Sequence, residues 1–434
     1  MLKVIFSLIF FVFFIIVSSA GARIYLDINS PTLVQIPIAL AKWKSLEKSP
    51  PDLLEKVYDI LSNNLTLSGF FRVIDHRHFP PPLQKREGIP DTLVLEEWRA
   101  AGGEILLTGE ILFDANNLNV KLKFHLFDLV EQKHLIGKQY EGHLQTIRSM
   151  VHRMTDEVVL QLTGERGVHN TKIAYVGLQE GSKEIFVADF DGTGVRQITQ
   201  NRSISISPAW SPDNRKIAFT SYIKRNPDLY LIDTDGKNLR RFSYHPGLNV
   251  SASFSPDGKQ IALMMGMEGK SDIFVIDADG DHPKKLTKGH GNEASPRWAP
   301  DGQSIAFVSD RSGSPQIYLM AHDGSNVRRL TYEGNYNTSP AWSPKGDRLA
   351  YCGRVGGRFQ IFTIGIDRSN LQRLTGSGDN ESPSWSPDGR YIAFDSNRSG
   401  LSKIFVMNSN GFNQRQLTST KGGESSPAWS RRFD

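Results

Sequence analysis

The chain has 434 residues, which is enough for two domains, and its 39% hydrophobic and 22% charged residues are ordinary for a globular protein. The net charge of +5 and a pI near 9.0 would suit a nucleic-acid-binding protein. However, the lysines and arginines are dispersed among 46 acidic residues without a basic run, so we expect no nucleic-acid partner. The single cysteine, Cys352, cannot form an internal disulfide, and its apolar neighbours predict a buried structural thiol.

The first 22 residues have the pattern of a secretory signal peptide. Lys3 supplies a positive start, residues 4–17 form an apolar stretch of 14 residues, and small residues precede the cleavage position. A membrane-spanning helix needs about 20 apolar residues, so this stretch is short for one. We therefore predict cleavage after Ala22, a mature chain that begins at Arg23, and no direct insertion of the mature chain into a membrane.

Residues 23–165 are predicted to form a small α/β domain. Apolar residues at helical spacing predict three helices, and apolar or alternating stretches predict strands that form a mixed sheet with them. Three consecutive prolines predict an exposed loop. The helices are expected at residues 52–65, 91–101 and 147–162, the strands at 105–111 and 120–126, and the proline loop at 80–82.

Residues 166–434 contain six copies of a phrase close to Ser-Pro-x-Trp-Ser-Pro-Asp-Gly. The aromatic position of this phrase recurs every 43 or 44 residues. A period in the low forties that is composed of short strands is typical of β-propeller blades rather than helical solenoids. Each period holds four strand-like stretches, which predicts four-stranded blades. The aromatic positions are Trp210, Phe254, Trp298, Trp342, Trp385 and Trp429.

The two ends of the repeat array predict how the ring closes. Residues 173–199 supply three strands without an aromatic phrase before them, whereas the last phrase, at residues 426–430, has no strands after it. Together these pieces complete one blade and leave no open sheet edge between them. The predicted fold is therefore multidomain, α/β plus all-β: a small N-terminal α/β domain followed by a six-bladed β-propeller closed by the C-terminal strand.

No motif in the chain predicts catalysis or a bound metal. A propeller peptidase would carry a Gly-x-Ser-x-Gly elbow in a hydrolase domain, and the nearest sequence, residues 302–306, lies within a blade. Residues 277–281 are rich in aspartate but lack the glycine and glutamate positions of a calcium loop, so they suit a hairpin turn. The 11 histidines include no pair at metal-ligand spacing on a recognisable helix. We predict no catalytic residues, no metal site and no cofactor.

Two phrases resemble a known family. Residues 162–176, Leu-Thr-Gly-Glu-Arg-Gly-Val-His-Asn-Thr-Lys-Ile-Ala-Tyr-Val, resemble the hinge phrase of the TolB family, the periplasmic component of the Tol-Pal cell-envelope system. Residues 98–104, Trp-Arg-Ala-Ala-Gly-Gly-Glu, resemble the N-terminal domain of that family. The domain order and the six-blade array agree, so the resemblance covers essentially the whole mature chain. The departures are Phe254 for a tryptophan, Asn214 and Lys345 in Asp-Gly turns, and Arg368 for a turn glycine.

The resemblance implies a function as well as a fold. TolB-like proteins are non-catalytic adaptors that bind the peptidoglycan-associated lipoprotein Pal and the protein TolA in the periplasm of Gram-negative bacteria. For this chain the resemblance implies a monomeric adaptor that maintains outer-membrane integrity and supports envelope constriction in cell division. An alternative from another class stays open, namely a periplasmic propeller that binds a small glycan or peptide at its channel, with hydrolytic activity.

The resemblance also implies that the mature N-terminal segment binds TolA. Apolar and polar side chains alternate in this segment, as in a strand that adds to the edge of a partner's sheet. The same alternation suits a first strand of the α/β domain, and the two arrangements can be alternate states of one switch. The segment consists of Arg23, Ile24, Tyr25, Leu26, Asp27 and Ile28.

Pal is expected on one face of the propeller. The loops that join the outer strand of one blade to the inner strand of the next crowd around one mouth of the central channel. They contain short polar residues, glycines and carboxylates, which suit a docking surface. The alternative is that these side chains only cap strand ends. The predicted contact residues are Leu248, Ser251, His290, Asn292, Glu293, Ala294, Asn337, Thr338, Asn380, Glu381 and Glu424.

Overall fold

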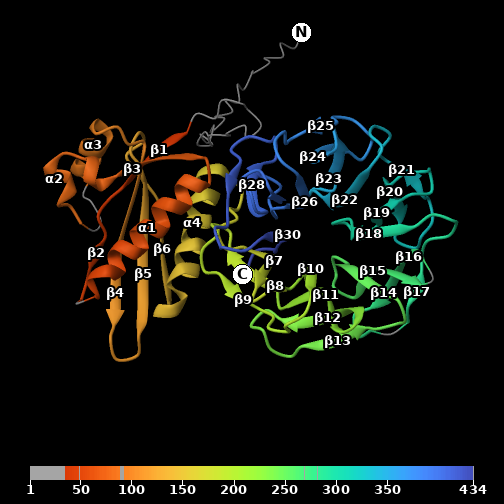
Figure 1. Cartoon of the computed structure of the whole chain (residues 1–434). Coiled ribbons are helices and arrows are strands. Elements are labelled where there is room, and N and C mark those ends of the chain that lie inside the picture. Colours follow the sequence, from red (N-terminus) through yellow and green to blue (C-terminus); the bar gives the residue numbers. More distant parts are fainter. Residues whose placement is uncertain (1–34, 48, 88–91, 268, 281, 434) are drawn as a thin grey trace, which may run out of the picture.

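The computed structural model describes residues 35–47, 49–87, 92–267, 269–280 and 282–433, and it divides into a domain built on one large sheet and a ring of six smaller sheets (Figure 1). The predicted signal peptide and the segment from Arg23 to Ile28 lie outside the described residues. Within the described ranges, no helix is long and apolar enough to cross a membrane.

The N-terminal domain is built on a six-stranded mixed sheet with the order β3-β1-β4-β5-β6, in which β2 also pairs with β4. Strand β1 runs parallel to β3 and β4, whereas β4, β5 and β6 are antiparallel neighbours. Burial alternates along β5, which confirms the predicted alternation of this strand. The strands are β1 (Ile36–Leu40), β2 (Lys44–Ser45), β3 (Phe71–Asp75), β4 (Ile105–Asp114), β5 (Asn119–Asp128) and β6 (Lys133–His143).

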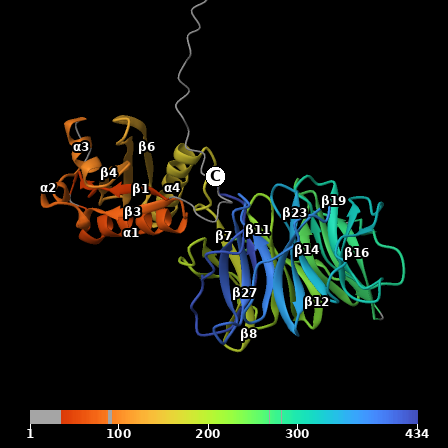
Figure 2. The same cartoon turned by 90° about the horizontal axis from the view of Figure 1, so that it is seen from above.

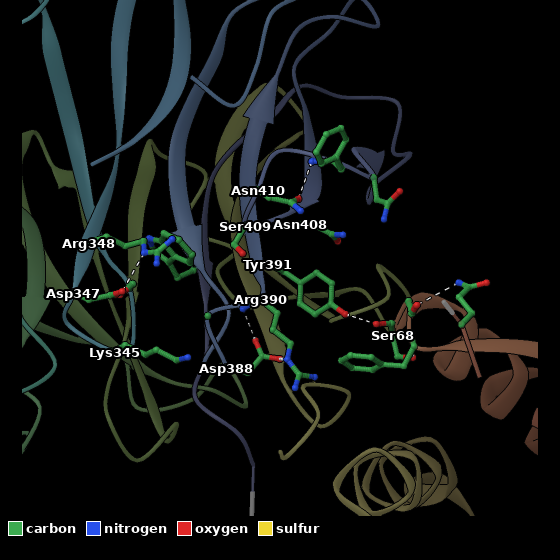
Figure 3. Close-up of a pocket in the computed structure, with 18 of the residues that line it drawn as sticks. Ser68, Lys345, Asp347, Arg348, Asp388, Arg390, Tyr391, Asn408, Ser409 and Asn410 are labelled. Carbon is green, nitrogen blue, oxygen red and sulfur yellow. Dashed lines mark hydrogen bonds and ion pairs between the residues drawn. The ribbon is translucent and has the colours of Figure 1, made fainter. Parts of the chain in front are cut away.

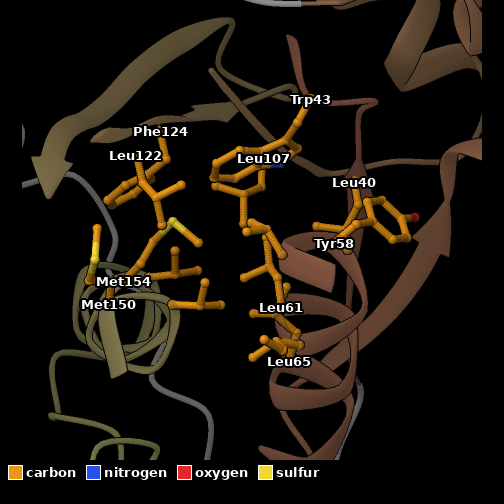
Figure 4. Close-up of a cluster of buried hydrophobic side chains, with 14 of the residues drawn as sticks. Leu40, Trp43, Tyr58, Leu61, Leu65, Leu107, Leu122, Phe124, Met150 and Met154 are labelled. Carbon is orange, nitrogen blue, oxygen red and sulfur yellow. The ribbon is translucent and has the colours of Figure 1, made fainter. Parts of the chain in front are cut away.

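Two long helices cover one face of this sheet. α1 (Pro51–Leu67) and α4 (Ile147–Thr163) lie side by side, and their apolar side chains meet those of the sheet in one buried cluster (Figure 4). Leu61, Phe124 and Met154 are fully buried there. The helical spacing read from the sequence therefore marked the buried faces of both helices correctly.

Shorter elements cover the opposite face. α3 (Thr92–Ala100) places Trp98 edge-on against Phe79, at 4.7 Å between ring centroids. The proline stretch is not a loop throughout, because Pro81 begins the four-residue helix α2 (Pro81–Gln84). Proline fits the first turn of a helix, since its missing N–H needs no partner there. Two 3-10 helices, η1 (His76–His78) and η2 (Leu144–Thr146), complete the domain.

The propeller consists of six four-stranded antiparallel blades, as predicted. Its inner strands line the centre of the ring in Figure 1. The blades are blade 1, β10 (Ser205–Trp210), β11 (Lys216–Lys224), β12 (Asn226–Asp233) and β13 (Arg240–Ser243); blade 2, β14 (Leu248–Phe254), β15 (Gln260–Met267), β16 (Lys270–Asp277) and β17 (Lys284–Lys285); blade 3, β18 (Glu293–Trp298), β19 (Ser304–Ser309), β20 (Gln316–Ala321) and β21 (Arg328–Arg329); blade 4, β22 (Asn337–Trp342), β23 (Arg348–Val355), β24 (Arg358–Gly365) and β25 (Gln372–Arg373); blade 5, β26 (Asn380–Trp385), β27 (Tyr391–Ser396), β28 (Lys403–Asn408) and β29 (Arg415–Gln416); and blade 6, β30 (Glu424–Trp429), β7 (Lys172–Gln179), β8 (Ser182–Asp189) and β9 (Arg196–Gln197).

Blade 6 joins the two ends of the propeller, which confirms the predicted closure. Its inner strand β30 comes from the C-terminus, and β7, β8 and β9 come from the start of the propeller. The indole Nε1 of Trp429 donates a hydrogen bond to Thr171 Oγ1 at 2.8 Å. Asn214 of blade 1 donates from Nδ2 to the carbonyl oxygen of Arg431 at 3.0 Å. The last residues are therefore held by the blades on both sides.

A short connection links the two domains. α4 ends at Thr163, Gly164 adopts a left-handed conformation with φ of 77°, and β7 begins at Lys172. The boundary predicted between residues 165 and 166 falls in this connection. Figure 2 turns the ring on its side, and the N-terminal domain lies beside one end of it.

The propeller has two ends because successive strands of each blade are antiparallel. The joint end, which the N-terminal domain contacts, holds turns 190–195, 211–215, 234–239, 255–259, 299–303, 322–327, 343–347, 366–371, 386–390 and 409–414. The open end holds two kinds of segment. The first are the inter-blade loops, which enter the inner strands at residues 204, 248, 292, 336, 379 and 423. The second are the turns between the second and third strands of a blade, at residues 178–182, 225, 310–315, 355–358 and 397–402. Backbone hydrogen bonds join the two kinds of open-end segment, for example from Asp310 to Asn292 and from Asn397 to Asp379.

Candidate interaction surfaces

The N-terminal domain is attached to the joint end partly through blade 5. Arg390 forms an ion pair with Glu165 at 2.6 Å, and its guanidinium lies 4.4 Å from the ring centroid of Phe70. Tyr391 donates from its hydroxyl to the carbonyl oxygen of Ser68 at 2.8 Å (Figure 3). These contacts combine charge, aromatic stacking and hydrogen bonding across the two domains.

A cavity of about 580 Å³ lies beside this contact, between the N-terminal domain and blades 4 and 5 (Figure 3). Its walls carry the cationic side chains of Arg72, Lys345 and Arg348. Asp388 also lines the cavity, and burial raises the pKa of its carboxyl above the ordinary value of 3.8. Gln35, where the described part of the chain begins, belongs to the same wall.

A second part of the joint is centred on His169, in the connection between the domains. Its ring is 2% exposed, Nδ1 lies 2.7 Å from Asp156 Oδ1, and Nε2 lies 3.1 Å from the backbone oxygen of Asn64. Asp156 also accepts hydrogen bonds from the backbone N–H groups of His169 and Asn170. Burial alone would raise the pKa of Asp156, but these hydrogen bonds and the His169 charge hold it below 3.8.

His152 of α4 lies next to this group and is equally buried. Its Nδ1 lies 3.0 Å from the side-chain nitrogen of Asn64, and its Nε2 lies 3.7 Å from Asp189 Oδ2 of the propeller. Lys172 forms an ion pair with the other oxygen of Asp189 at 2.5 Å. Both His152 and His169 stand edge-on to the ring of Phe190, at centroid distances of 5.5 and 4.8 Å. Sequence analysis missed this cluster, because the residues come from α1, α4, the connection and β8.

At the open end, four of the predicted Pal-contact side chains are buried. Each occupies the first position of an inner strand and bonds to its own blade, to the loop before it or to the preceding blade. Asn337 donates to Gln316 and to the carbonyl oxygen of Glu333, and Glu293 accepts a hydrogen bond from Arg311 at 2.9 Å. These side chains therefore shape the loops from inside, and their contact with Pal stays a prediction. The four are Glu293, Asn337, Asn380 and Glu424.

The remaining predicted Pal-contact residues lie closer to the surface. Leu248, His290 and Asn292 are exposed, and Asn292 donates from Nδ2 to Asp310 at 3.0 Å. Ser251, Ala294, Thr338 and Glu381 are half-buried. The structure therefore brings these residues to one end of the ring, and their contact with Pal stays a prediction.

A β-bulge recurs in every inner strand beside these positions. The pairing register shifts at the same place in all six blades, and the serine there adopts a positive φ between 51° and 59°. Bulges bend a strand and re-aim the side chains next to them. Ser251 was predicted as a contact residue but is one of these bulge residues, which are Ser207, Ser251, Ser295, Ser339, Ser382 and Ser426.

An apolar patch missed by the sequence analysis lies at the open end of blade 4. Tyr336, from the loop before β22, packs edge-on against Phe359 at 5.7 Å between ring centroids, and its backbone oxygen accepts a hydrogen bond from Arg354. Tyr336 and the adjacent Val355 are 38% and 43% exposed. The available signal was an aromatic residue between two asparagines in the loop, Asn335 and Asn337.

Two carboxyl groups lie beside this patch, on blade 5. Glu381 and Asp395 are directly opposite each other in the β26–β27 ladder. Burial raises the pKa of both groups, and the Asp395 charge raises the pKa of Glu381 further. Asp379 connects them to the patch, because its carboxylate accepts a hydrogen bond from the backbone N–H of Phe359 at 3.0 Å. Within the described ranges, no group of three His, Cys, Asp or Glu side chains could hold a metal ion.

Comparison with known sequences assigns both halves of the chain to one family. Residues 159–433 match the TolB beta propeller domain, and residues 24–135 match the TolB amino-terminal domain. The chain belongs to the TolB family. Relatives named Tol-Pal system protein TolB are 37% identical over 194 residues in Desulfosudis oleivorans and 38% identical over 204 residues in Syntrophus aciditrophicus. These matches span 44% and 46% of this chain and only 43% and 45% of the relatives' own length.

Solved structures support the same family and fold. TolB from Acinetobacter baumannii is 28% identical, with a TM-score of 0.79 over 92% of this chain and 97% of that chain. A putative TolB from Agrobacterium tumefaciens is 23% identical, with a TM-score of 0.50 over 61% of this chain and 99% of that chain, and it supports the fold alone.

The residues that depart from the TolB repeat pattern keep its backbone geometry. Asn214 replaces a turn glycine with φ of 57°, and its side chain holds the C-terminus. Arg368 adopts φ of 73° where the matching turns of other blades have glycine. Lys345 replaces the aspartate of a turn that keeps Gly346 at φ of 72°. Each of these three turns therefore keeps a residue with positive φ, although one of its residues differs from the repeat pattern.

Proposed function

We propose that this chain is a monomeric, non-catalytic adaptor of the Tol-Pal system that acts in the periplasm of a Gram-negative bacterium after cleavage behind Ala22. It binds Pal at the open end of the propeller and TolA through residues 23–28. In this role it maintains outer-membrane integrity and supports envelope constriction in cell division. Membership of the TolB family and the names of its relatives support the proposal.

The observation that carries the proposal is the state of the open end. The N-terminal domain contacts the joint end, so the open end is accessible to a partner. Tyr336 and Val355 expose apolar surface there, next to the carboxyl groups of Glu381 and Asp395. Exposed apolar surface with a polar border is typical of protein-protein interfaces, and tyrosine often contributes much of their binding energy.

The proposed TolA segment precedes the described part of the chain, which begins at Gln35 in the wall of the interdomain cavity. If docking of this segment changes the propeller, TolA and Pal must alter each other's affinity by the same factor. Deletion of residues 23–28 should then change the affinity for Pal, and an unchanged affinity would contradict the coupling.

The decisive experiment is calorimetric titration of the mature chain with the soluble domain of Pal from the same organism. We expect saturable one-to-one binding that weakens at least about tenfold in Ala294→Arg, because the new side chain would obstruct the open end. Ala321→Arg is the matched control, since Ala321 is a half-buried residue at the joint end of blade 3. Thermal unfolding of both variants establishes that they are folded.

Two results would contradict the proposal. Absence of binding well above micromolar concentration would remove Pal as the partner and favour a small glycan or peptide ligand. Equal loss of affinity for Pal in Ala294→Arg and Ala321→Arg would show that the binding site does not lie at the open end.

A further inference from the structure

The fourth strand of each blade lies at the outer edge of its sheet and carries cationic side chains. The paired positions of these six strands hold arginine, lysine, glutamine, phenylalanine or serine, and no carboxylate. Charged side chains on short edge strands prevent sheets from pairing edge to edge. Edge protection therefore accounts for cations in every blade, and a more specific role has to show itself as a difference between blades.

Blades 1 and 2 neutralise the second cation of the outer strand. Arg241 forms an ion pair with Asp228 at 2.6 Å, and Lys285 forms one with Asp272 at 2.6 Å. Both carboxylates come from the third strand of the same blade and are buried. The outer edge of these two blades is thus compensated from within.

Blades 3 and 4 lack this compensation. Gln316 occupies the position of Asp228, since each lies opposite a serine of the second strand, and Gln360 is the corresponding residue of blade 4. Arg329 and Arg373 instead donate from Nε to the backbone oxygen two residues further along the chain, at 2.5 and 2.7 Å. Within the part of the chain that the structure describes, neither arginine has a carboxylate partner.

An exposed tyrosine joins arginines from these two blades. The guanidinium of Arg329 lies 4.7 Å from the ring centroid of Tyr332, and that of Arg368, from a turn of blade 4, lies 5.4 Å from it. Arg328 donates from Nη2 to the carbonyl oxygen of Ile366 in the same turn at 2.9 Å. Tyr332 is 58% exposed. We call Arg328, Arg329, Tyr332 and Arg368 the Arg-Tyr cluster.

Two carboxylates are adjacent to the cluster in sequence. Asp367 accepts hydrogen bonds from the backbone N–H and the hydroxyl of Ser369, at 2.9 and 2.6 Å, and Glu333 is exposed. Among the described residues, neither forms an ion pair with an arginine of the cluster. The guanidinium groups therefore keep unused N–H donors toward solvent.

We propose that the Arg-Tyr cluster binds an acidic segment of a protein partner. A guanidinium can bind a carboxylate through two parallel hydrogen bonds, and arginine and tyrosine are enriched in protein interfaces. Contacts with backbone oxygens and with the ring already orient these arginines, which lowers the entropy lost on binding. An anionic membrane would need cations over an extended surface, whereas blades 1 and 2 neutralise theirs. The inference is independent of the partners proposed for the open end.

The test is fluorescence anisotropy of a labelled peptide of glutamate and serine, titrated with the mature full chain. We expect saturable binding that weakens as the salt concentration rises. Arg329→Gln combined with Arg368→Gln should lower the affinity at least about fivefold, because one exposed ion pair contributes a factor of up to about five.

Blade 1 offers the matched control. Arg241 lies 4.7 Å from the ring centroid of Tyr244, which is 61% exposed, so its stack resembles that of blade 3 apart from the ion pair with Asp228. Arg241→Gln removes an equal charge and should bind the peptide normally. Thermal unfolding of every variant establishes that it is folded.

Gln316→Asp tests the charge without removing an arginine. It gives blade 3 the carboxylate that blades 1 and 2 have, so it should also weaken peptide binding. The position tolerates aspartate in blade 2, where Asp272 accepts a hydrogen bond from Thr287 as Gln316 does from Thr331.

Three results would overturn the proposal. The first is full affinity for the peptide in the double arginine variant. The second is an equal loss of affinity in Arg241→Gln, which would reduce the effect to overall charge. The third is binding to phosphatidylglycerol vesicles but not to the peptide, lost in the double variant, which would assign the cluster to lipid headgroups.

Discussion

The two ends of the propeller use the same blade architecture for different purposes. At the joint end, the carboxylates of Asp156 and Asp189 meet histidine and lysine, and their pKa values are lowered although burial opposes this. At the open end, Glu381 and Asp395 face each other without a cationic partner in the structure, and burial raises their pKa values. The two joint-end carboxylates are paired with histidine or lysine, whereas the two open-end carboxyl groups have no ion pair among the described residues. The comparison indicates that stability and recognition are separated along the axis of the ring.

The largest expected effect is at the joint. Asp156→Ala leaves His169 and two backbone N–H groups without their acceptor, and unsatisfied buried donors of this kind cost about 3 kcal/mol in total. We therefore expect the free energy of unfolding, measured in urea, to fall by about this amount. Asp301→Ala is the control, because Asp301 is exposed and accepts one backbone hydrogen bond, from Gln303. Equal losses in both variants would show that the joint contributes no special stability.

An intermediate effect is expected at the open end, on affinity rather than stability. Tyr336→Ala removes the exposed ring of the apolar patch and should weaken Pal binding about tenfold or more, as for an interface tyrosine that contributes over 1.4 kcal/mol. Its free energy of unfolding should fall by only about 1 kcal/mol, because one edge-on contact with Phe359 is lost. Leu239→Ala, which truncates an exposed side chain at the joint end, is the matched control and should bind Pal normally. Full affinity in Tyr336→Ala would separate the patch from the Pal site.

The smallest expected effect concerns the carboxyl pair. Glu381→Gln removes like-charge repulsion between directly opposed residues, which amounts to about 0.2–1 kcal/mol. Because burial and the Asp395 charge raise the folded-state pKa of Glu381, the wild-type chain loses stability as the pH rises above 4.5, and the variant lacks the part of this loss that comes from Glu381. Thermal unfolding should therefore show a stabilised variant at pH 7 and no difference well below pH 4.5. A constant difference at all pH values would exclude charge as the cause.

The propeller was predictable because its signals are local and repeated. Each turn glycine, inner-strand tryptophan and apolar strand recurs at a fixed interval, so six weak signals reinforce one another. The unmatched pieces at residues 173–199 and 426–430 predicted the closing blade, which the structure confirms. The N-terminal helices were predictable for a similar reason, because the spacing of residues such as Leu61 and Met154 follows the helical period.

The interaction surfaces were predictable only in part. Loop position identified the end of the ring to which Ala294 and Thr338 belong, but it did not separate surface side chains from those that bond inward, such as Asn337 and Asn380. All four follow the same loop pattern in the sequence. The burial of Asn337 and Asn380 depends on hydrogen bonds to side chains that are distant in the chain, such as the one between Asn337 and Gln316.

The sequence alone determined the number of blades, the order of the domains and the family, because these depend on periodicity and local phrases. Only the tertiary structure decided how His152, His169 and Asn64 meet, since they come from α4, the connection and α1, and Asn64 is 88 residues from His152. It also decided that Glu381 opposes Asp395 and that Tyr336 meets Phe359. Protonation state and exposure follow from such contacts, and contacts between distant residues leave no periodic trace in a single sequence.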